Sequence, residues 1–180
     1  MAVHSFNTTL GGLINGRKIV IPEIQRAYSW SVGDTSKEDA ADVAASALIE
    51  DLEEYHKSVT SGADYGYYLG SLIVLIDKGQ DVKSSKVTWN LLDGQQRITT
   101  LTIMFNEIYK RLQLYDESDE IKNSMKRIRR DWLQLGRGAE PPEEKWKCTI
   151  YPRRDLDRNA LRAIIKQEGV DELPEGNMRE

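Results

Sequence analysis

The junction between residues 87 and 112 constrains the fold more than any other part of the sequence. The β-branched and apolar run at 87–92 predicts a strand, and Asp93-Gly94 follows it directly. Beyond this turn, apolar side chains recur at helical spacing as far as Leu112. A strand that passes through a glycine turn straight into a helix is typical of α/β and α+β folds. We therefore expect a mixed α and β protein with a small mixed sheet.

Weaker patterns predict the remaining elements. Helical spacing of apolar residues indicates helices at 6–14, from Ser36 to about Ser58, at 117–135 and at 157–167. In the second of these, Ser36 is the predicted N-cap and Asp39 its capping partner. Further strands are expected at 17–21, 67–76 and 147–151. The strand at 67–76 is expected to be buried and to form a hairpin with the strand at 87–92. These patterns divide the chain into an α/β domain at 1–105 and a mostly helical extension at 106–180. We expect the extension to be truncated before a further domain.

Composition excludes several classes of protein. The chain has 180 residues, 39% of them hydrophobic, which is enough for a core. Lys and Arg number 25 against 29 Asp and Glu, so a uniformly basic nucleic-acid-binding domain is excluded. One cysteine and two histidines exclude an intrachain disulfide and a His-metal nuclease centre. No apolar run approaches the roughly 20 residues that span a bilayer, and no secretion signal is recognisable, so we expect a cytoplasmic protein without a membrane partner.

The residues Asp93 to Arg97 form a candidate anion site. The start of a helix presents unpaired backbone N–H groups and a partial positive charge. Gly94 has no Cβ to obstruct a phosphate, Arg97 adds a cationic fork, and Gln95 and Gln96 are able to orient a water molecule. The alternative is a capping box, in which Asp93 is the N-cap and Gln96 its reciprocal partner.

A second cluster follows the strand at 17–21. It contains Pro22, Gln25, Arg26, Tyr28 and Trp30. Arg26 is suited to a phosphate, and an aromatic face is suited to a base or a sugar. The alternative is a surface loop fixed by two half-buried aromatic side chains.

A basic group of residues lies in the predicted helix at 117–135. It consists of Lys126, Arg127, Arg129 and Arg130, with Arg137 nearby. These cations either contact DNA phosphates, for which Lys126, Arg127 and Arg130 are our candidates, or form a solvated helix face balanced by Glu120 and Asp131.

Three segments in a fixed order carry a family resemblance: "IPEIQRAYSW", "YYLGSLIV" and "LLDGQQRITTLTIM". Together they resemble the N-terminal domain of the GmrSD-type, modification-dependent (type IV) restriction endonucleases. The sequence is also similar to the related phosphorothioate-sensing defence protein SspE. The resemblance covers residues 5 to about 112, and more loosely continues to about 165 through "YPRRDLDRNALRAII".

The resemblance implies a ParB/sulfiredoxin-like fold that binds nucleotide phosphates. It implies NTP hydrolysis, with GTP favoured, at the Asp-Gly-Gln-Gln-Arg motif, whose catalytic residues correspond to Asp93, Gln95, Gln96 and Arg97. Nucleotide binding would involve Gln25, Arg26, Gly94 and Arg97. Sensing of modified DNA would involve Pro22, Gln25, Arg26 and Tyr28. In such a fold the Gln25–Arg26 loop and the Asp93–Arg97 turn are expected to lie across one cleft.

We therefore expect an NTPase that regulates a DNA-cleaving partner, a C-terminal HNH-type nuclease domain or subunit outside this chain. The chain alone is not expected to cut DNA. Mg²⁺ would accompany the triphosphate, with Asp93 as its carboxylate ligand. No GxxxxGK(S/T) sequence occurs, so a P-loop mechanism is excluded. Two alternatives stay open: a non-hydrolytic sensor that binds modified DNA through the Gln25/Arg26 cleft, and an interaction domain whose motifs only maintain the fold.

Overall fold

The computed structural model describes residues 5–14, 18–36, 43–77, 79, 87–115, 118–133 and 149–166. Its elements in chain order are α1 (Leu10–Ile14), β1 (Lys18–Ile21), α2 (Ala44–Thr60), β2 (Ile73–Leu75), β3 (Thr88–Asp93), α3 (Gln95–Leu112), α4 (Asp119–Ile128), the π-helical turn η1 (Arg129–Leu133), β4 (Ile150–Pro152) and α5 (Asp155–Lys166). Within these ranges, no helix is long and apolar enough to cross a membrane.

The four strands form one sheet in the order β2-β3-β1-β4. β1 is parallel to both of its neighbours, β3 and β4, and β2 is antiparallel to β3 at one edge. Ile19, Val20 and Ile21 of β1 are all buried, as expected for a central strand covered on both faces. The sheet is small and mixed, so the predicted α+β class is confirmed.

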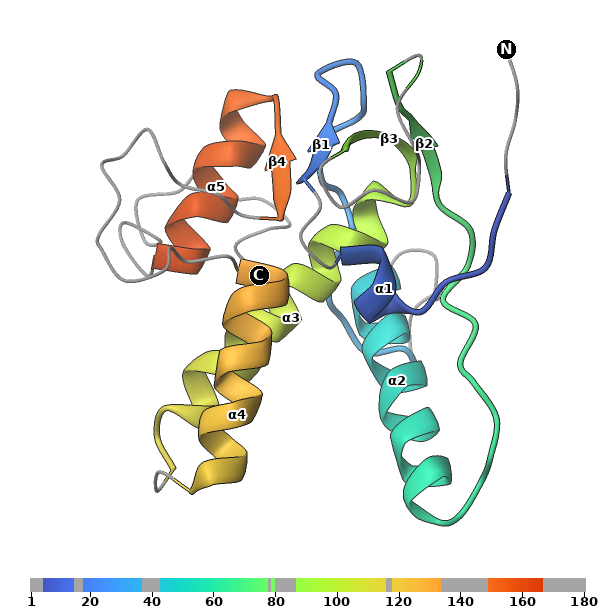
Figure 1. The fold of residues 1–180 in the computed structure, drawn as a ribbon, viewed down its shortest axis with the longest axis vertical. Helices are drawn as coiled ribbons and strands as arrows, with labels where there is room; N and C mark the ends of the chain where they lie inside the picture. Colours follow the sequence, from blue (N-terminus) through green and yellow to red (C-terminus); the bar gives the residue numbers. More distant parts are fainter. Residues whose placement is uncertain are drawn as a thin grey trace.

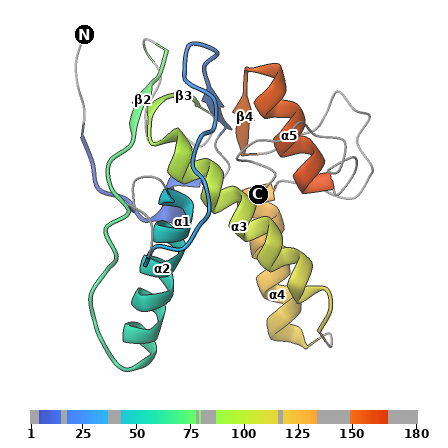
Figure 2. The same cartoon turned by 180° about the vertical axis from the view of Figure 1, so that it is seen from behind.

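The helix α3 is the central helix of the molecule. It lies between α2 on one side and α4 with α5 on the other (Figures 1 and 2). Its buried polar groups bind within the protein: Thr102 donates to the carbonyl of Ile98, and Asn106 donates to the carbonyl of Ile164 in α5. These bonds stabilise the packing of the helix, because a polar side chain removed from bulk water needs a partner within the protein.

The second half of the chain shares the sheet and the core of the first half. Ile150 of β4 pairs with Ile19 of β1, and Trp132 of η1 stacks on Phe105 of α3 with ring centroids 4.2 Å apart. Ile150, Trp132 and Ile19 all belong to one cluster of buried apolar residues. The predicted division of the chain at residue 105 stays a prediction, and β4 is the element that joins the two parts within the sheet.

The predicted buried strand at 67–76 is wrong in both length and burial. Only Ile73–Leu75 forms a strand, at the edge of the sheet, with Ile73 54% and Leu75 40% exposed. The predicted hairpin is confirmed, because β2 pairs antiparallel with β3. The residues before β2 are not in a strand because Gly70 has a positive φ of 96°, and the carbonyls on either side of it bind a side chain of α3.

The predicted helix from Ser36 starts later than expected. The structure begins α2 at Ala44, and Val43 precedes it without a side-chain cap. Ser36 is therefore not the N-cap of α2, and its hydroxyl donates to the carboxylate of Asp34. Its predicted partner Asp39 lies outside the described residues.

Candidate functional site

Three parallel strands end at the same edge of the sheet. β1 leads into the loop at 22–30, β3 into the turn before α3, and β4 into Arg153, Arg154 and α5. Figure 1 shows the loop after β1 beside the start of α5. Ligands of α/β sheets commonly bind at the carboxyl ends of the strands. We call this region, residues 22–30, 93–97 and 153–158, the strand-end site.

The start of α3 has no side-chain cap. Gly94 is the N-cap residue, with a left-handed φ of 90°, and no side chain accepts a hydrogen bond from the first amides of the helix. The alternative of an Asp93–Gln96 capping box is therefore wrong. A Cβ at Gly94 would lie 2.0 Å from Cδ2 of Leu72, so only glycine fits this turn without a shift of its neighbours. The helix start keeps the backbone groups that favour an anion.

The side chain of Gln96 binds the loop after β1 instead. Its Oε1 accepts from the backbone N–H groups of Ser29 (2.9 Å) and Trp30 (3.3 Å), and its Nε2 donates to the carbonyl of Ala27 (3.0 Å). Gln96 is only 5% exposed. These three bonds fix the orientation of the amide and satisfy three backbone groups of the loop.

Two further glutamines join the same loop to the β3–α3 junction. Gln95 donates from Nε2 to the carbonyl of Arg26 (2.8 Å), and Gln25 donates from Nε2 to the carbonyl of Leu92 (3.1 Å). The two sequence motifs therefore adjoin each other, although 69 residues separate Arg26 from Gln95. The expected proximity of the loop and the turn is present in the structure.

Arg97 holds the segment before β2 against the start of α3. Its guanidinium donates from Nη1 to the carbonyl of Leu69 (2.6 Å) and from Nη2 to that of Ser71 (2.7 Å), and Nη2 lies 3.8 Å from the Asp93 carboxylate. A Cβ at Gly70 would lie 2.0 Å from Nη1. Because arginine has five N–H donors, two bonds to carbonyls leave donors for a phosphate.

Arg26 and Tyr28 differ in their surroundings. The side chain of Arg26 is exposed and makes no hydrogen bond or ion pair to any described residue. Tyr28 is half-buried, and its hydroxyl lies 2.8 Å from that of Thr100 in α3. Burial raises the pKa of Tyr28, so the phenol stays protonated at neutral pH. Pro22 begins the loop, and its carbonyl accepts from the amide of Gln25.

Asp157 of α5 is a site residue that sequence reasoning missed. Its half-buried carboxylate lies 3.9 Å from the guanidinium of Arg154, and the backbone N–H of Tyr28 favours its ionised form. Burial raises the pKa of Asp157, and Arg154 and the Tyr28 amide oppose this shift. The sequence feature that could have indicated Asp157 is its position three residues after Arg154 at the start of a predicted helix, a spacing that brings the two side chains together.

The predicted DNA-backbone residues do not lie at the strand-end site. Lys126, Arg127 and Arg130 belong to α4 and η1, which pack against each other, α3 and α1. Arg130 pairs with Asp131 through Nε (2.5 Å) and Nη2 (2.8 Å), whereas Lys126 and Arg127 are exposed. Arg137 lies outside the described residues.

Comparison with known protein families identifies the family of the chain. Residues 10–175 match the family described as the N-terminal domain of the GmrSD restriction endonuclease. No curated protein matches the chain. The matched range includes all three parts of the strand-end site and extends through α5.

The contact between Gly70 and Arg97 predicts the effect of an added methyl group. Gly62 has the same φ of 96° with nothing near its Cβ position, so Gly62→Ala measures the conformational penalty alone, roughly 1–2 kcal/mol. We expect Gly70→Ala to lower the free energy of unfolding by roughly 1–3 kcal/mol more, measured by urea denaturation. In an Arg97→Ala background this excess should disappear. An equal cost in both backgrounds would show that the guanidinium does not confine Gly70.

The three bonds of Gln96 predict a large effect on stability. Gln96→Ala leaves two N–H groups and one carbonyl of the loop without their partner, and should lower the free energy of unfolding by roughly 1–3 kcal/mol. The matched control is Gln113→Ala, an exposed glutamine at the other end of α3, with an effect within about 0.5 kcal/mol. Similar melting curves for the two variants would contradict the role assigned to Gln96.

The raised pKa of Asp157 predicts a pH dependence of stability. The contribution of the Asp157 carboxyl group to the free energy of unfolding is fully present below the pKa of the unfolded state, about 4. This contribution is lost as the pH rises through the higher pKa of the folded state. Asp157→Asn keeps an acceptor oxygen for the Tyr28 amide but does not ionise. The variant should therefore gain stability relative to the wild type as the pH rises through this window, measured by chemical denaturation. Asp64→Asn, at an exposed carboxyl, is the control, and parallel curves for Asp157→Asn and the wild type would refute the prediction.

Proposed function

The chain belongs to the family of GmrSD restriction endonuclease N-terminal domains, and we propose that it binds and hydrolyses a nucleoside triphosphate, with GTP favoured, at the strand-end site. In this proposal, hydrolysis regulates DNA cleavage by a nuclease domain or subunit outside the chain. Family membership supports the setting in a restriction system. The geometry of the strand-end site supports the choice of an anionic nucleotide as ligand.

The observation that carries the proposal is the uncapped start of α3 at the edge where three strands end. Its first amides and the partial positive charge of the helix favour a phosphate group, and Gly94 allows a close approach. Arg26 is exposed on the adjoining loop and has no partner among the described residues, so it is the cation best placed to bind further phosphate oxygens. Arg97 adds its remaining donors from the first turn of α3.

Gln95 and Gln96 have different roles in this proposal. Gln96 uses its amide oxygen and nitrogen on three backbone groups of the loop, which makes it a positioning residue. Gln95 is 8% exposed, and its Oε1 is a buried acceptor without a hydrogen-bond partner among the described residues. A buried acceptor of this kind is suited to bind and orient a water molecule. We therefore assign the water-orienting role to Gln95.

Asp93 fits the Mg²⁺ that accompanies a triphosphate. In nucleotide sites this ion usually takes one or two carboxylates, and phosphates and water complete its coordination. The Asp93 carboxylate is 60% exposed beside the start of α3. In the described ranges no group of three or more potential metal ligands occurs, so a site built from protein ligands alone is not supported there. The ion would supply charge neutralisation for the phosphates.

The sensor function is the second candidate, and one observation favours it. The side chains of Gln96 and Arg97 already bind the protein backbone, so part of the motif has a structural role that needs no catalysis. In this case the loop with Pro22, Gln25, Arg26 and Tyr28 would bind modified DNA without hydrolysis. Arg26 would contact the DNA, because the Tyr28 hydroxyl is held by Thr100.

Phosphate release from GTP and ATP distinguishes the two candidates. We expect wild-type protein to hydrolyse nucleotide, Arg26→Ala to raise KM roughly 10-fold through the loss of a charged hydrogen bond, and Gln95→Ala to lower kcat roughly 10²-fold. Arg127→Ala, which removes an exposed cation from α4, should leave both constants unchanged. Melting curves check that each variant is folded.

Two results would contradict the proposal. Wild-type protein that binds nucleotide but releases no phosphate would favour the sensor. Hydrolysis unchanged in both Arg26→Ala and Gln95→Ala would place the active site elsewhere. Incubation of the same protein with plasmid and Mg²⁺ should give no nicking, since cutting is assigned to another domain.

A further inference from the structure

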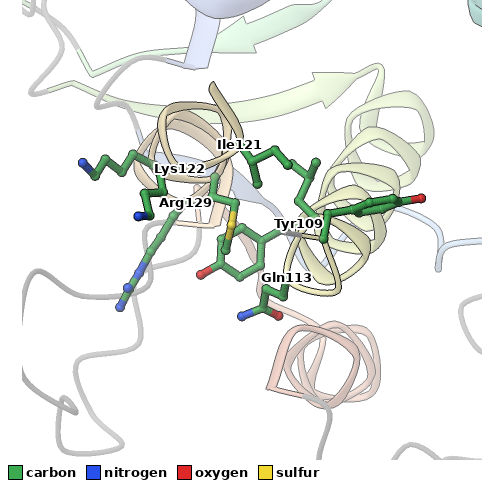
Figure 3. Close-up of a pocket in the computed structure, with 9 residues that line it drawn as sticks. Tyr109, Gln113, Ile121, Lys122 and Arg129 are labelled. Atoms are coloured by element: carbon green, nitrogen blue, oxygen red, sulfur yellow. The ribbon is translucent and has the colours of Figure 1, made fainter. Parts of the chain in front are cut away.

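A pocket of about 370 Å³ lies between the C-terminal half of α3 and α4, and the proposed function makes no use of it. Residues of α3 and the turn after it supply Tyr109 and Tyr115, and α4 with η1 supplies Lys122, Lys126 and Arg129. Figure 3 shows Lys122 and Arg129 on one side of the pocket and Tyr109 and Gln113 on the other. The pocket therefore combines aromatic and cationic walls.

The sequence of α4 explains why the cations gather there. Lys122, Lys126 and Arg129 are spaced by four and three residues, which places them on one face of a helix. No carboxylate is among the described residues that line the pocket. Of the acidic residues near this pocket, Glu107 pairs with Lys110, and Asp131 pairs with Arg130. The described lining residues thus include three basic side chains, of which Lys126 is exposed.

We propose that the α3–α4 pocket binds the base and phosphate of a nucleotide, as a site separate from the strand-end site. Its volume is within the range of small-molecule sites, roughly 300–1,000 Å³. A planar base can stack on a tyrosine ring while the phosphate binds the cations of α4. Tyr115 is 65% exposed, so one ring is open to a ligand. The ligand is either a free nucleotide or a nucleotide within a single strand.

Paired substitutions test this site. Lys126→Ala removes a cation of the pocket, whereas Lys57→Ala removes an exposed cation in the last turn of α2 that does not line it. Tyr115→Leu removes the stacking ring, and Tyr115→Phe keeps it. The probes are thymidine monophosphate and a fluorescent oligothymidylate of ten nucleotides, measured by isothermal titration and by anisotropy. Neither probe carries a triphosphate, and GTP hydrolysis is measured in parallel.

The expected result is that at least one probe binds roughly 5- to 10-fold more weakly to Lys126→Ala and Tyr115→Leu, and less than 2-fold more weakly to Lys57→Ala and Tyr115→Phe. Hydrolysis and melting temperature should not change, which separates this site from the strand-end site. Binding of the oligonucleotide alone would assign the ligand to a strand, and binding of the monophosphate would assign it to a free nucleotide. Equal losses in Lys126→Ala and Lys57→Ala, or no binding of either probe to the folded wild-type protein, would overturn the proposal.

Discussion

The side-chain amide of Gln96 binds three backbone groups of the loop after β1, and the geometry of the strand-end site depends on these bonds. Backbone N–H and C=O groups removed from water need partners, and a loop has no neighbouring strand to provide them. Gln96 provides them from the first turn of the central helix. The first turn of α3 therefore sets the positions of Arg26 and Tyr28. This turn also presents the backbone amides that are proposed to bind phosphate. One element thus positions both halves of the site.

The local part of this arrangement is predictable from the sequence, and the non-local part is not. The strand at 87–92 and the helix that follows it depend on residue types within one segment, so the pattern predicts them correctly. The run at 67–76 has the composition of a buried strand, but Arg97 binds the carbonyls of Leu69 and Ser71, and this distant partner decides its conformation. Gln96 likewise fits a local capping role in the sequence. Its real partners lie 66 to 69 residues away.

The C-terminal part of the chain reaches the loop through β4 and α5. β4 lies beside β1 in the sheet, and this register brings the first turn of α5 next to the loop that leaves β1. At this point the backbone N–H of Arg153 donates to the carbonyl of Ile21, the last residue of β1. The backbone N–H of Tyr28 in turn favours the ionised form of Asp157 in the first turn of α5. The strand-end site therefore contains residues from both the N-terminal and the C-terminal parts of the chain.

The two sites proposed at the ends of α3 would attract anions by different means. At its start the attraction comes from backbone amides and the helix dipole, which are fixed in place by the fold and need no flexible side chain. At its other end the dipole is unfavourable to an anion, and Lys110 and Arg111 in the last turn offset it. The α3–α4 pocket therefore depends on the charges of Lys126 and its neighbours on α4. At physiological salt, the attraction between exposed charges falls off over a distance of about 8–10 Å. The hydrogen bonds from backbone amides that touch a ligand are much less sensitive to this screening. If both proposed sites bind their ligands, binding in the pocket is expected to weaken with salt more steeply than binding at the start of α3.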